Sequence, residues 1–193
     1  TLQKVIIECV LILITMIDVK PINSYILVQK IKEHNQIKDN LLSLMNKMPD
    51  REIATDFESI KKTDYYLPKE HVRGYGDLFL KTIKPYNDNI KNFYNAREFW
   101  IINYWYQQYQ DTDYHKWHVH PTTLLSNVYY VELENRNSTV FYDNVTKQEY
   151  KFELEEGDLV TFPSMLAHKS QSNSKSRKTI ISYNADFNNI NIG

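Results

Sequence analysis

From residue 98 onward the sequence is a series of short runs rich in β-branched and aromatic residues, and this series constrains the fold more than any other feature. Turn-forming residues separate the runs, for example at 134–137 (ENRN) and at 156–158 (EGD). The runs cover residues 98–109, 127–133, 138–142, 149–154, 158–162 and 178–187. Several short strands at this spacing predict a β-sandwich or a β-barrel.

The first half of the chain has a different pattern. Residues 24–31 predict a strand, and the apolar residues of 35–48 recur at the spacing of an amphipathic helix. Residues 50–66 are polar and aperiodic, so a loop is expected there. A second helical pattern covers 76–95, and Pro85 is expected to divide it into two pieces. The fold class expected is therefore mainly β with N-terminal helices.

The chain opens with an apolar run at residues 5–17 that contains Glu8. This run is shorter than the roughly 20 apolar residues that a membrane-spanning helix needs, and no signal-peptide cleavage pattern follows it. Because Met16 begins a stretch typical of a soluble domain, residues 1–15 are interpreted either as a non-native or disordered extension or as a first buried strand or helix. One domain is expected over 16–193, with no membrane association.

Composition argues against several classes of protein, although it leaves a local basic groove possible. The 193 residues include 23 Lys and Arg against 24 Asp and Glu, so no basic excess exists to bind a nucleic-acid backbone by bulk electrostatics. The single cysteine, Cys9, excludes an intrachain disulfide framework and a cysteine-based zinc ribbon. Such cysteine usage is typical of a reducing compartment, which predicts a cytoplasmic location.

Histidines provide the candidate chemistry. His118 and His120 are two residues apart, so in an extended chain they point to the same face. His168 follows the predicted strand at 158–162 and is expected to meet them across the sheet. Three imidazoles suit iron, copper, zinc or nickel, and three protein ligands leave open positions for catalysis. A His-x-His pair also arises by chance, so the pair alone is a weak signal.

A second candidate feature lies nine residues after His168. Arg177 lies one residue before the predicted strand at 178–187. If the strand is extended to include it, Arg177 and Thr179 share one face. A guanidinium beside a hydroxyl is a natural receptor for the carboxylate of a small acid. The competing interpretation is a surface arginine that closes the loop at 172–176.

The ordered segments at 117–130, 156–168 and 177–184 resemble those of the 2-oxoglutarate and Fe(II)-dependent oxygenases. The resemblance is specific to a group from phages and marine bacteria with a His-x-His-Pro motif, and it covers about residues 98–187. It implies a double-stranded β-helix, the cupin-like jelly-roll barrel, with helical support at about 32–97 and a jelly-roll core at about 98–187. If the chain is phage-encoded, the expected location is the host cytoplasm.

The resemblance also implies a metal site. His118 and His168 match the first and the distal iron ligand, and His120 stands where most relatives have Asp or Glu. Either three histidines bind Fe(II), or His120 moves away and water or chloride takes its place. Asp113 and Asp143 are candidate substitutes for the missing carboxylate, although each is also a typical turn residue.

The resemblance assigns the co-substrate as well. Arg177, assisted by Thr179, would bind the far carboxylate of 2-oxoglutarate, and Tyr106 and Tyr129 are candidate further contacts. Which parity of their strands faces inward is open. The implied reaction uses dioxygen, converts 2-oxoglutarate to succinate and hydroxylates an unidentified small-molecule or peptide substrate. A homodimer is compatible with the sequence.

Two other functions fit the same residues. One is a cupin-like three-histidine dioxygenase or isomerase without 2-oxoglutarate, although the glutamate expected shortly after a cupin His-x-His is absent, since the next one is Glu132. The other is a catalytically silent jelly-roll binding module, which would hold no metal. His115 is out of strand parity with His118 and is expected in a loop or outside the ligand set.

Overall fold

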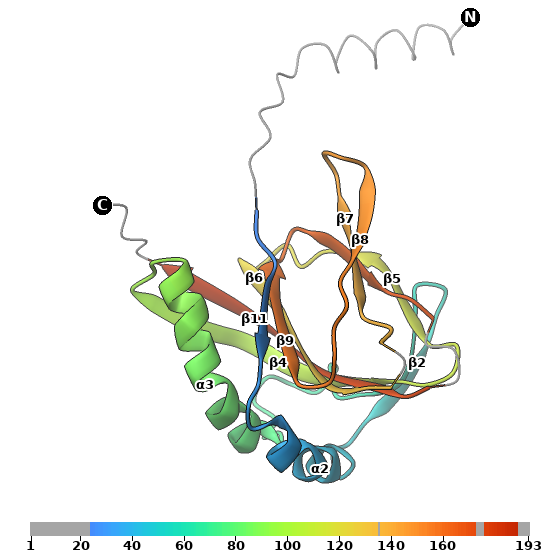
Figure 1. Cartoon of the computed structure of the whole chain (residues 1–193). Helices are drawn as coiled ribbons and strands as arrows, with labels where there is room; N and C mark the ends of the chain where they lie inside the picture. The colour runs from blue at the N-terminus through green and yellow to red at the C-terminus, as the bar shows by residue number, and fades with distance from the viewer. Residues whose placement is uncertain (1–23, 135, 173–175, 189–193) are drawn as a thin grey trace, which may run out of the picture.

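The computed structural model describes residues 24–134, 136–172 and 176–188 (Figure 1). The interpretation of residues 1–15 therefore falls outside the described residues and stays a prediction. Within the described part, no helix combines the length and the apolar character needed to cross a membrane.

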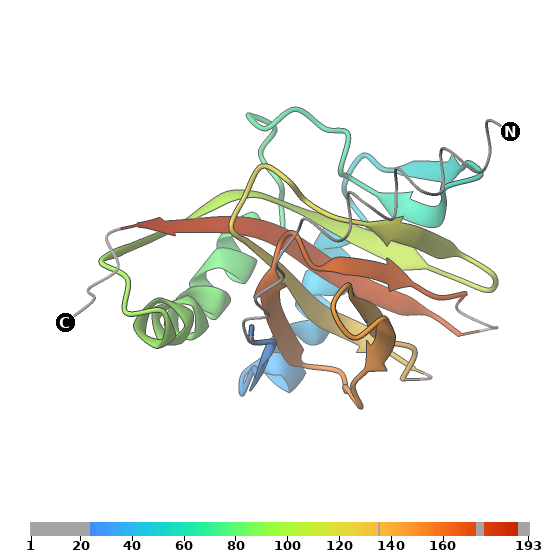
Figure 2. The same cartoon turned by 90° about the horizontal axis from the view of Figure 1, so that it is seen from above.

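The described residues form one antiparallel sheet that curls on itself, together with two helices (Figures 1 and 2). The strand order is β1-β9-β6-β11-β4-β3-β5-β10-β7-β8, and β2 pairs with β3. The strands are β1 (Leu27–Lys30), β2 (Arg51–Ala54), β3 (Glu58–Thr63), β4 (Glu98–Tyr109), β5 (Tyr114–His118), β6 (Leu125–Leu133), β7 (Thr139–Asp143), β8 (Gln148–Lys151), β9 (Asp158–Pro163), β10 (Ala167–Ser170) and β11 (Lys178–Asn188). This arrangement is the jelly-roll double-stranded β-helix, which confirms the predicted fold class.

The helices α2 (His34–Met45) and α3 (Gly76–Phe93) cover the outer face of the sheet around β4, β6 and β11 (Figure 1). Successive strand residues point to opposite faces, so each of these strands contributes to two cores. Tyr106, Tyr129 and Ile181 pack outward against the helices. Tyr130 and Ile180 pack inward with a second set from β7 and β9. The inner core surrounds the floor of the barrel and leaves one end for a site.

The predicted loop at 50–66 is wrong, because this segment forms strands β2 and β3. Ile53 and Ile60 are its buried apolar residues, and they join the inner core, while Thr63 and Asp64 are buried among polar groups. The remaining positions face solvent or neighbouring polar groups, so the segment has no apolar periodicity in its sequence. Strand β3 pairs with both β4 and β5, and it thereby joins the two layers of the barrel.

The expected division of the second helix at Pro85 is also wrong, because α3 continues through it. Proline removes one backbone donor and leaves the carbonyl four residues earlier without its helical partner. Pro85 and Lys81 both lie on the exposed face of α3, where water can satisfy that carbonyl. The buried side chains of the other face, among them Phe79 and Ile83, hold the helix together across this point.

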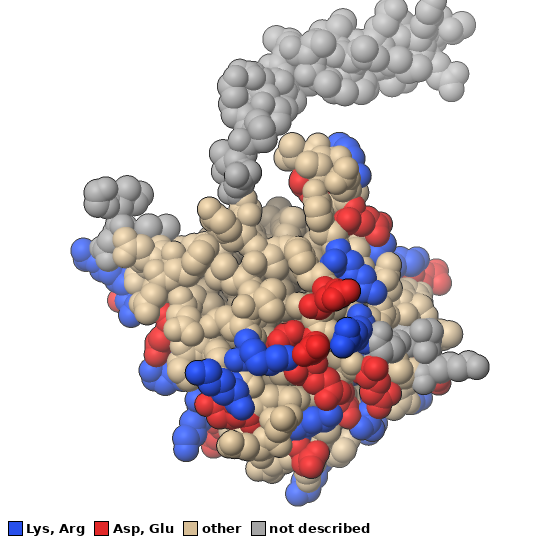
Figure 3. All heavy atoms as spheres, in the orientation of Figure 1, with Lys and Arg blue, Asp and Glu red and all other residues tan. Residues whose placement is uncertain are grey.

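Charged side chains of both signs are interspersed on the face of the molecule shown in Figure 3. This distribution agrees with the near balance of 23 basic and 24 acidic residues in the sequence. On that face no broad basic surface of the kind that tracks a nucleic-acid backbone is visible.

Candidate metal centre

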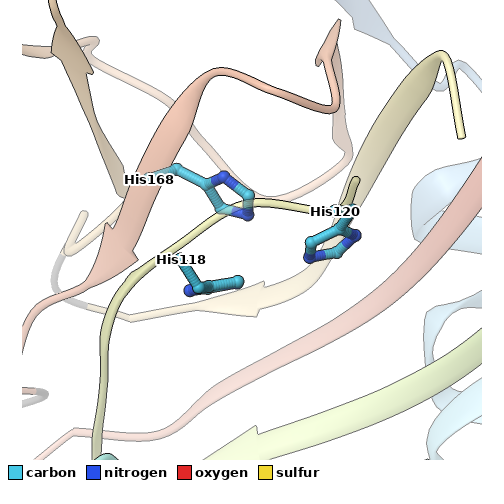
Figure 4. Close-up of side chains that lie close together, drawn as sticks. All are labelled: His118, His120 and His168. Carbon is cyan, nitrogen blue, oxygen red and sulfur yellow. The ribbon is translucent and has the colours of Figure 1, made fainter. Parts of the chain in front are cut away.

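Three histidines from two strands and a loop meet at one end of the barrel, with their rings close together (Figure 4). His118 ends β5 and lies directly opposite His168 of β10 in the antiparallel register. Their ring centroids are 4.2 Å apart, and the His120 ring lies 5.3 Å from His118 and 5.2 Å from His168. One nitrogen from each ring lies within 4.8 Å of the other two, a spacing that one metal ion can bridge.

The backbone beyond β5 brings His120 to the other two histidines. His120 lies outside the strand, so strand parity does not set its direction. Its N–H donates to the carbonyl of Ser164, at 2.8 Å, in the turn between β9 and β10. This hydrogen bond connects the loop after β5, which carries His120, to the turn that precedes His168.

Hydrogen bonds fix the tautomer of each ring. The Nδ1 of His118 lies 2.8 Å from the carbonyl oxygen of Lys116, and that of His168 lies 2.9 Å from the carbonyl oxygen of Leu166. A carbonyl can only accept, so in both rings Nδ1 carries the proton and Nε2 keeps its lone pair. Metal-binding histidines are held in this way by acceptors behind the ring.

The same arrangement holds for His120. Its Nδ1 lies 2.7 Å from Oδ1 of Asn184, on β11, and 3.1 Å from the hydroxyl of Ser126, on β6. The Ser126 hydroxyl also donates to Asn184 Oδ1, at 3.2 Å, so the amide oxygen is oriented toward the ring. A proton on Nδ1 then leaves the His120 Nε2 as a third neutral donor.

Burial keeps these rings uncharged. It lowers the pKa of His118 to about 4 and the pKa of His168 well below the usual value, and it lowers the pKa of His120 as well. Neutral imidazole is the form that binds a metal. The three lone pairs are consequently available at neutral pH without displacing a proton.

A cavity of about 370 Å³ opens beside the three histidines and runs into the barrel. Its polar lining includes Asn103 and Gln107 from β4 and Ser182 and Asn184 from β11. Its other lining residues include Phe57, Glu58, Tyr65, Trp105, Tyr109, His115, Phe162 and Ser170. The mixture of aromatic walls with a few polar groups is typical of a small-molecule site.

Lys178 is a functional candidate that the sequence analysis missed. Its side chain is fully buried, with Nζ donating to the hydroxyl of Ser170, at 2.5 Å, and to the carbonyl of Asn137, at 3.2 Å. The ammonium also lies 4.6 Å from the ring centroid of Tyr109. Within the described chain no carboxylate pairs with it, and burial lowers its pKa to about 7. Ser170 and Tyr109 line the cavity and Lys178 does not, so the buried ammonium lies behind these two residues.

Strand parity places Arg177 and Thr179 on the other side of the sheet from the cavity. Arg177 is about half exposed, and its guanidinium donates to a carboxylate oxygen of Glu132. The Thr179 hydroxyl donates to the second oxygen of Glu132, at 2.5 Å, and accepts from Gln108, at 3.1 Å. Neither residue lines the cavity. Lys178 was findable from the same parity, because it is in phase with Ile180, Ser182 and Asn184, which do line it.

Tyr106 and Tyr129 also point away from the cavity, toward the helices. The Tyr106 hydroxyl lies 3.4 Å from Asp50, and the Tyr129 hydroxyl lies 2.8 Å from Nδ1 of His34. The inward neighbours on β4 are Trp105 and Gln107, which line the cavity instead.

The acidic residues considered as substitute ligands serve in turns. Asp113 accepts hydrogen bonds from Ser59, at 2.6 Å, and from the N–H of Gln110, at 2.9 Å. Asp143 accepts from the N–H of Val145, at 2.7 Å. In the described part of the chain, the group close enough to share a metal contains only the three histidines.

His115 and Asn127 complete the surroundings. The His115 ring stacks on His118 with a centroid distance of 3.8 Å, and burial lowers its pKa to about 3. Asn127 accepts from Thr161, at 2.6 Å, and donates to the carbonyl of Tyr183, at 3.3 Å, so it joins the strands on either side of β6.

A divalent metal and a small dicarboxylate both fit these residues. Three neutral imidazoles from a rigid end of the barrel suit a transition metal, and they leave positions for other ligands. A buried ammonium without a carboxylate partner is stabilised by any anion that enters the cavity. The donor set and the cation thus favour a metal together with an acidic small molecule.

No family model and no curated relative matches the sequence. Solved structures do match. A 2OG-Fe(II) oxygenase family oxidoreductase from Burkholderia pseudomallei has a TM-score of 0.68 and 11% identity over 83% of this chain and 85% of its own. A prolyl-4-hydroxylase from Pseudomonas putida has a TM-score of 0.62 and 10% identity over 85% and 94%. HygX from Streptomyces hygroscopicus, with nickel and 2-oxoglutarate bound, has a TM-score of 0.64 and 7% identity over 84% and 83%. The chain therefore has the fold of the 2OG-Fe(II) oxygenases.

Proposed function

We propose that this protein is a 2-oxoglutarate and Fe(II)-dependent oxygenase whose metal is held by His118, His120 and His168. The observation that carries the proposal is the placement of a buried, carboxylate-free ammonium beside a cavity that begins at three neutral, convergent imidazoles. The ammonium would attract the far carboxylate of a diacid. The three imidazoles would hold the metal that binds the other end of the diacid. Structural neighbours with this fold include enzymes of the same reaction class.

In this proposal Lys178 takes the role that the sequence analysis assigned to Arg177. Ser170, which accepts from the Lys178 ammonium, is two residues from His168 along β10, a rise of about 6.6 Å. A five-carbon diacid can bridge such a distance. The Ser170 hydroxyl and the Tyr109 ring would orient the ammonium toward it. Arg177 is already neutralised by Glu132 on the opposite face.

The bound metal and co-substrate would supply the oxygen chemistry that hydroxylates a substrate while 2-oxoglutarate becomes succinate and carbon dioxide. The protein orients the imidazoles through Lys116, Leu166 and Asn184. The aromatic and aliphatic walls of the cavity exclude bulk water from the reacting groups. The substrate would be a small molecule or a peptide that enters at the open end.

The test is anaerobic addition of Fe(II) and 2-oxoglutarate, followed by the weak visible charge-transfer absorption of the chelate. We expect the band with the wild-type protein and its loss, at the same 2-oxoglutarate concentration, with Lys178→Met. Arg177→Ala is the matched control from the adjacent position, and we expect it to keep the band. Loss with Arg177→Ala and retention with Lys178→Met would contradict the assignment.

The absence of a carboxylate from the metal group in the described residues favours one second candidate. This is a three-histidine metal enzyme that does not use 2-oxoglutarate, as in cupin-like dioxygenases. Stoichiometric Fe(II) binding without the charge-transfer band would support it and would overturn the first proposal. If the protein bound no metal, both metal-dependent functions would be excluded, and the catalytically silent binding module would remain.

The affinity for 2-oxoglutarate should depend on pH through Lys178. Burial lowers the lysine pKa to about 7, so in the free protein the ammonium loses its proton as the pH rises above 7. The 2-oxoglutarate dianion binds the protonated form of Lys178, and this interaction raises the pKa of the lysine in the complex. The dissociation constant should therefore rise about tenfold per pH unit above 7 and stay flat just below it.

The measurement is an anaerobic titration of the band between pH 6.5 and 8.5. Lys178→Arg is the control, because a guanidinium stays charged throughout this range. Its affinity should lack the rise. The same slope in wild type and Lys178→Arg would mean that another group titrates.

A further inference from the structure

The outer wall of the cavity combines three aromatic rings with one acid: Phe57, Glu58, Tyr65 and Trp105. Phe57 and Tyr65 are 46% and 50% exposed, so both present ring surface to an incoming molecule. The Tyr65 ring packs edge-on against Trp105 with a centroid distance of 5.0 Å. We call this set the aromatic wall.

The Glu58 carboxylate in the aromatic wall has no lysine or arginine partner in the part of the chain that the structure describes. Its neighbours are the Tyr66 hydroxyl, at 3.3 Å, and Nε2 of His115, at 3.4 Å. Among the described residues no lysine or arginine nitrogen lies within ion-pair distance of Glu58. The side chain is 16% exposed and lines the cavity. Burial raises the pKa of its carboxyl group, and a cation that enters the cavity would favour the ionised form.

The other charged residue that lines the cavity cannot balance it. Lys169 pairs with Glu149, at 2.9 Å, and its ammonium lies 4.2 Å from the ring centroid of Trp117. Its charge is therefore already satisfied on the outer side of β10. The aromatic wall therefore holds one carboxyl group beside its ring faces, without a lysine or arginine partner among the described residues.

Aromatic faces attract cations through their negative quadrupole, and a carboxylate adds a direct charge interaction. A wall built from both prefers a cationic amine over a neutral group of equal size. It disfavours a polyanion, because phosphates would meet Glu58 first.

We propose that the substrate carries an alkylammonium group, held by the aromatic wall through Glu58, Phe57, Tyr65 and Trp105 while its reacting carbon lies near the three histidines. This inference rests on the proposed function for its reaction, but the binding that it predicts is measured separately. Glu58 of β3 lies opposite His115 of β5, and the His115 ring stacks on His118. A single imidazole ring therefore lies between the acid and a metal-binding histidine.

The test compares two probes of equal shape, choline and its uncharged isostere 3,3-dimethylbutan-1-ol. Binding is followed by calorimetry on the full chain under anaerobic conditions with Fe(II) and 2-oxoglutarate. We expect choline to bind about tenfold more tightly than the alcohol, in line with cation–π energies in partly desolvated sites. Glu58→Gln should remove most of that preference. Glu52→Gln, on the paired strand β2 and exposed beside Lys61, is the matched control and should retain it.

Equal affinities for the two probes in the wild-type protein would overturn the inference, as would a Glu58→Gln variant that keeps the preference for choline. A Glu58→Gln variant that loses the charge-transfer band instead would show that the acid serves the metal centre, and it too would overturn the inference. If Glu58→Gln fails to fold, Tyr65→Ser tests the same wall at a half-exposed position and should lower choline affinity.

The two proposals fail in different ways. A charge-transfer band without a choline preference removes the alkylammonium substrate and leaves the oxygenase. A choline preference without the band supports the aromatic wall as a cation site and removes the 2-oxoglutarate chemistry.

Discussion

Replacement of His168 by alanine is expected to lower the affinity for Fe(II) by more than about 100-fold. His168 is 5% exposed, its Nδ1 proton is held by the Leu166 carbonyl, and its ring centroid lies 4.2 Å from that of His118 and 5.2 Å from that of His120. Loss of the groups that merely orient a ligand costs about 10–100-fold in metal affinity, so loss of the ligand itself costs more. Anaerobic calorimetry with Fe(II) measures the change directly.

His71→Ala is the control for this experiment, because His71 is exposed and lies outside the metal group. It should bind Fe(II) as the wild type does. An unchanged affinity in His168→Ala would mean that the three histidines do not form the metal site, and both metal-dependent functions would then be excluded.

The same measurement on His120→Ala decides between the two states that the sequence left open. If His120 binds the metal, its removal should cost as much as that of His168. If a water or chloride takes its place, the loss should be small. The His120 Nδ1–H donates to Asn184 Oδ1 and lies close to the Ser126 hydroxyl, which favours the first outcome, because Nε2 keeps its lone pair and is directed away from both residues.

The long central strands were predictable from the sequence. The predicted run at 98–109 matches β4 residue for residue, and the run at 178–187 ends one residue before β11. These strands are buried on at least one face over most of their length, so apolar and aromatic residues mark them. The short strands β5 and β10 carry His118 and His168, and polar side chains of these strands point into the cavity, where solvent and ligands replace apolar neighbours.

Segment 51–63 shows why other elements could not be predicted. Strands β2 and β3 are held mainly by backbone pairing with each other and with β4 and β5, and only a few of their side chains are buried. Pairing between distant strands leaves little trace in the side-chain pattern. Polar strands of this kind are therefore taken for loops.

The directions of Arg177 and Lys178 could not be predicted for a similar reason. The sequence shows that the two residues point to opposite faces of a strand, but it does not show which face meets the cavity. That choice depends on how β11 sits between β4 and β6, with helices on one side only. The sequence favours the arginine because its fork suits a carboxylate, and the burial of the neighbouring lysine is visible only in the folded chain.

Replacement of Asp64 by asparagine should destabilise the fold by about 3–5 kcal/mol, because it leaves the Arg73 charge buried without a partner. The side chains of Asp64 and Arg73 are 0% and 7% exposed, and the Arg73 Nε donates to Oδ2 at 2.9 Å. The same oxygen accepts from the Tyr75 hydroxyl, at 2.9 Å, and Oδ1 accepts from the N–H of Tyr106, at 2.8 Å. The carboxylate thus joins the start of α3 to β4, next to the aromatic wall.

The measurement is the free energy of unfolding from urea denaturation, compared with the double variant Asp64→Asn/Arg73→Met. The double variant should be less destabilised than Asp64→Asn alone, since it removes the buried charge that the single change leaves unpaired. Glu52→Gln breaks the exposed pair with Lys61 and should change stability by about 1 kcal/mol or less. If Asp64→Asn matched Glu52→Gln, the buried pair would contribute no more than a surface pair, and the link between α3 and β4 would have to lie in the apolar contacts of Phe79 and Tyr104.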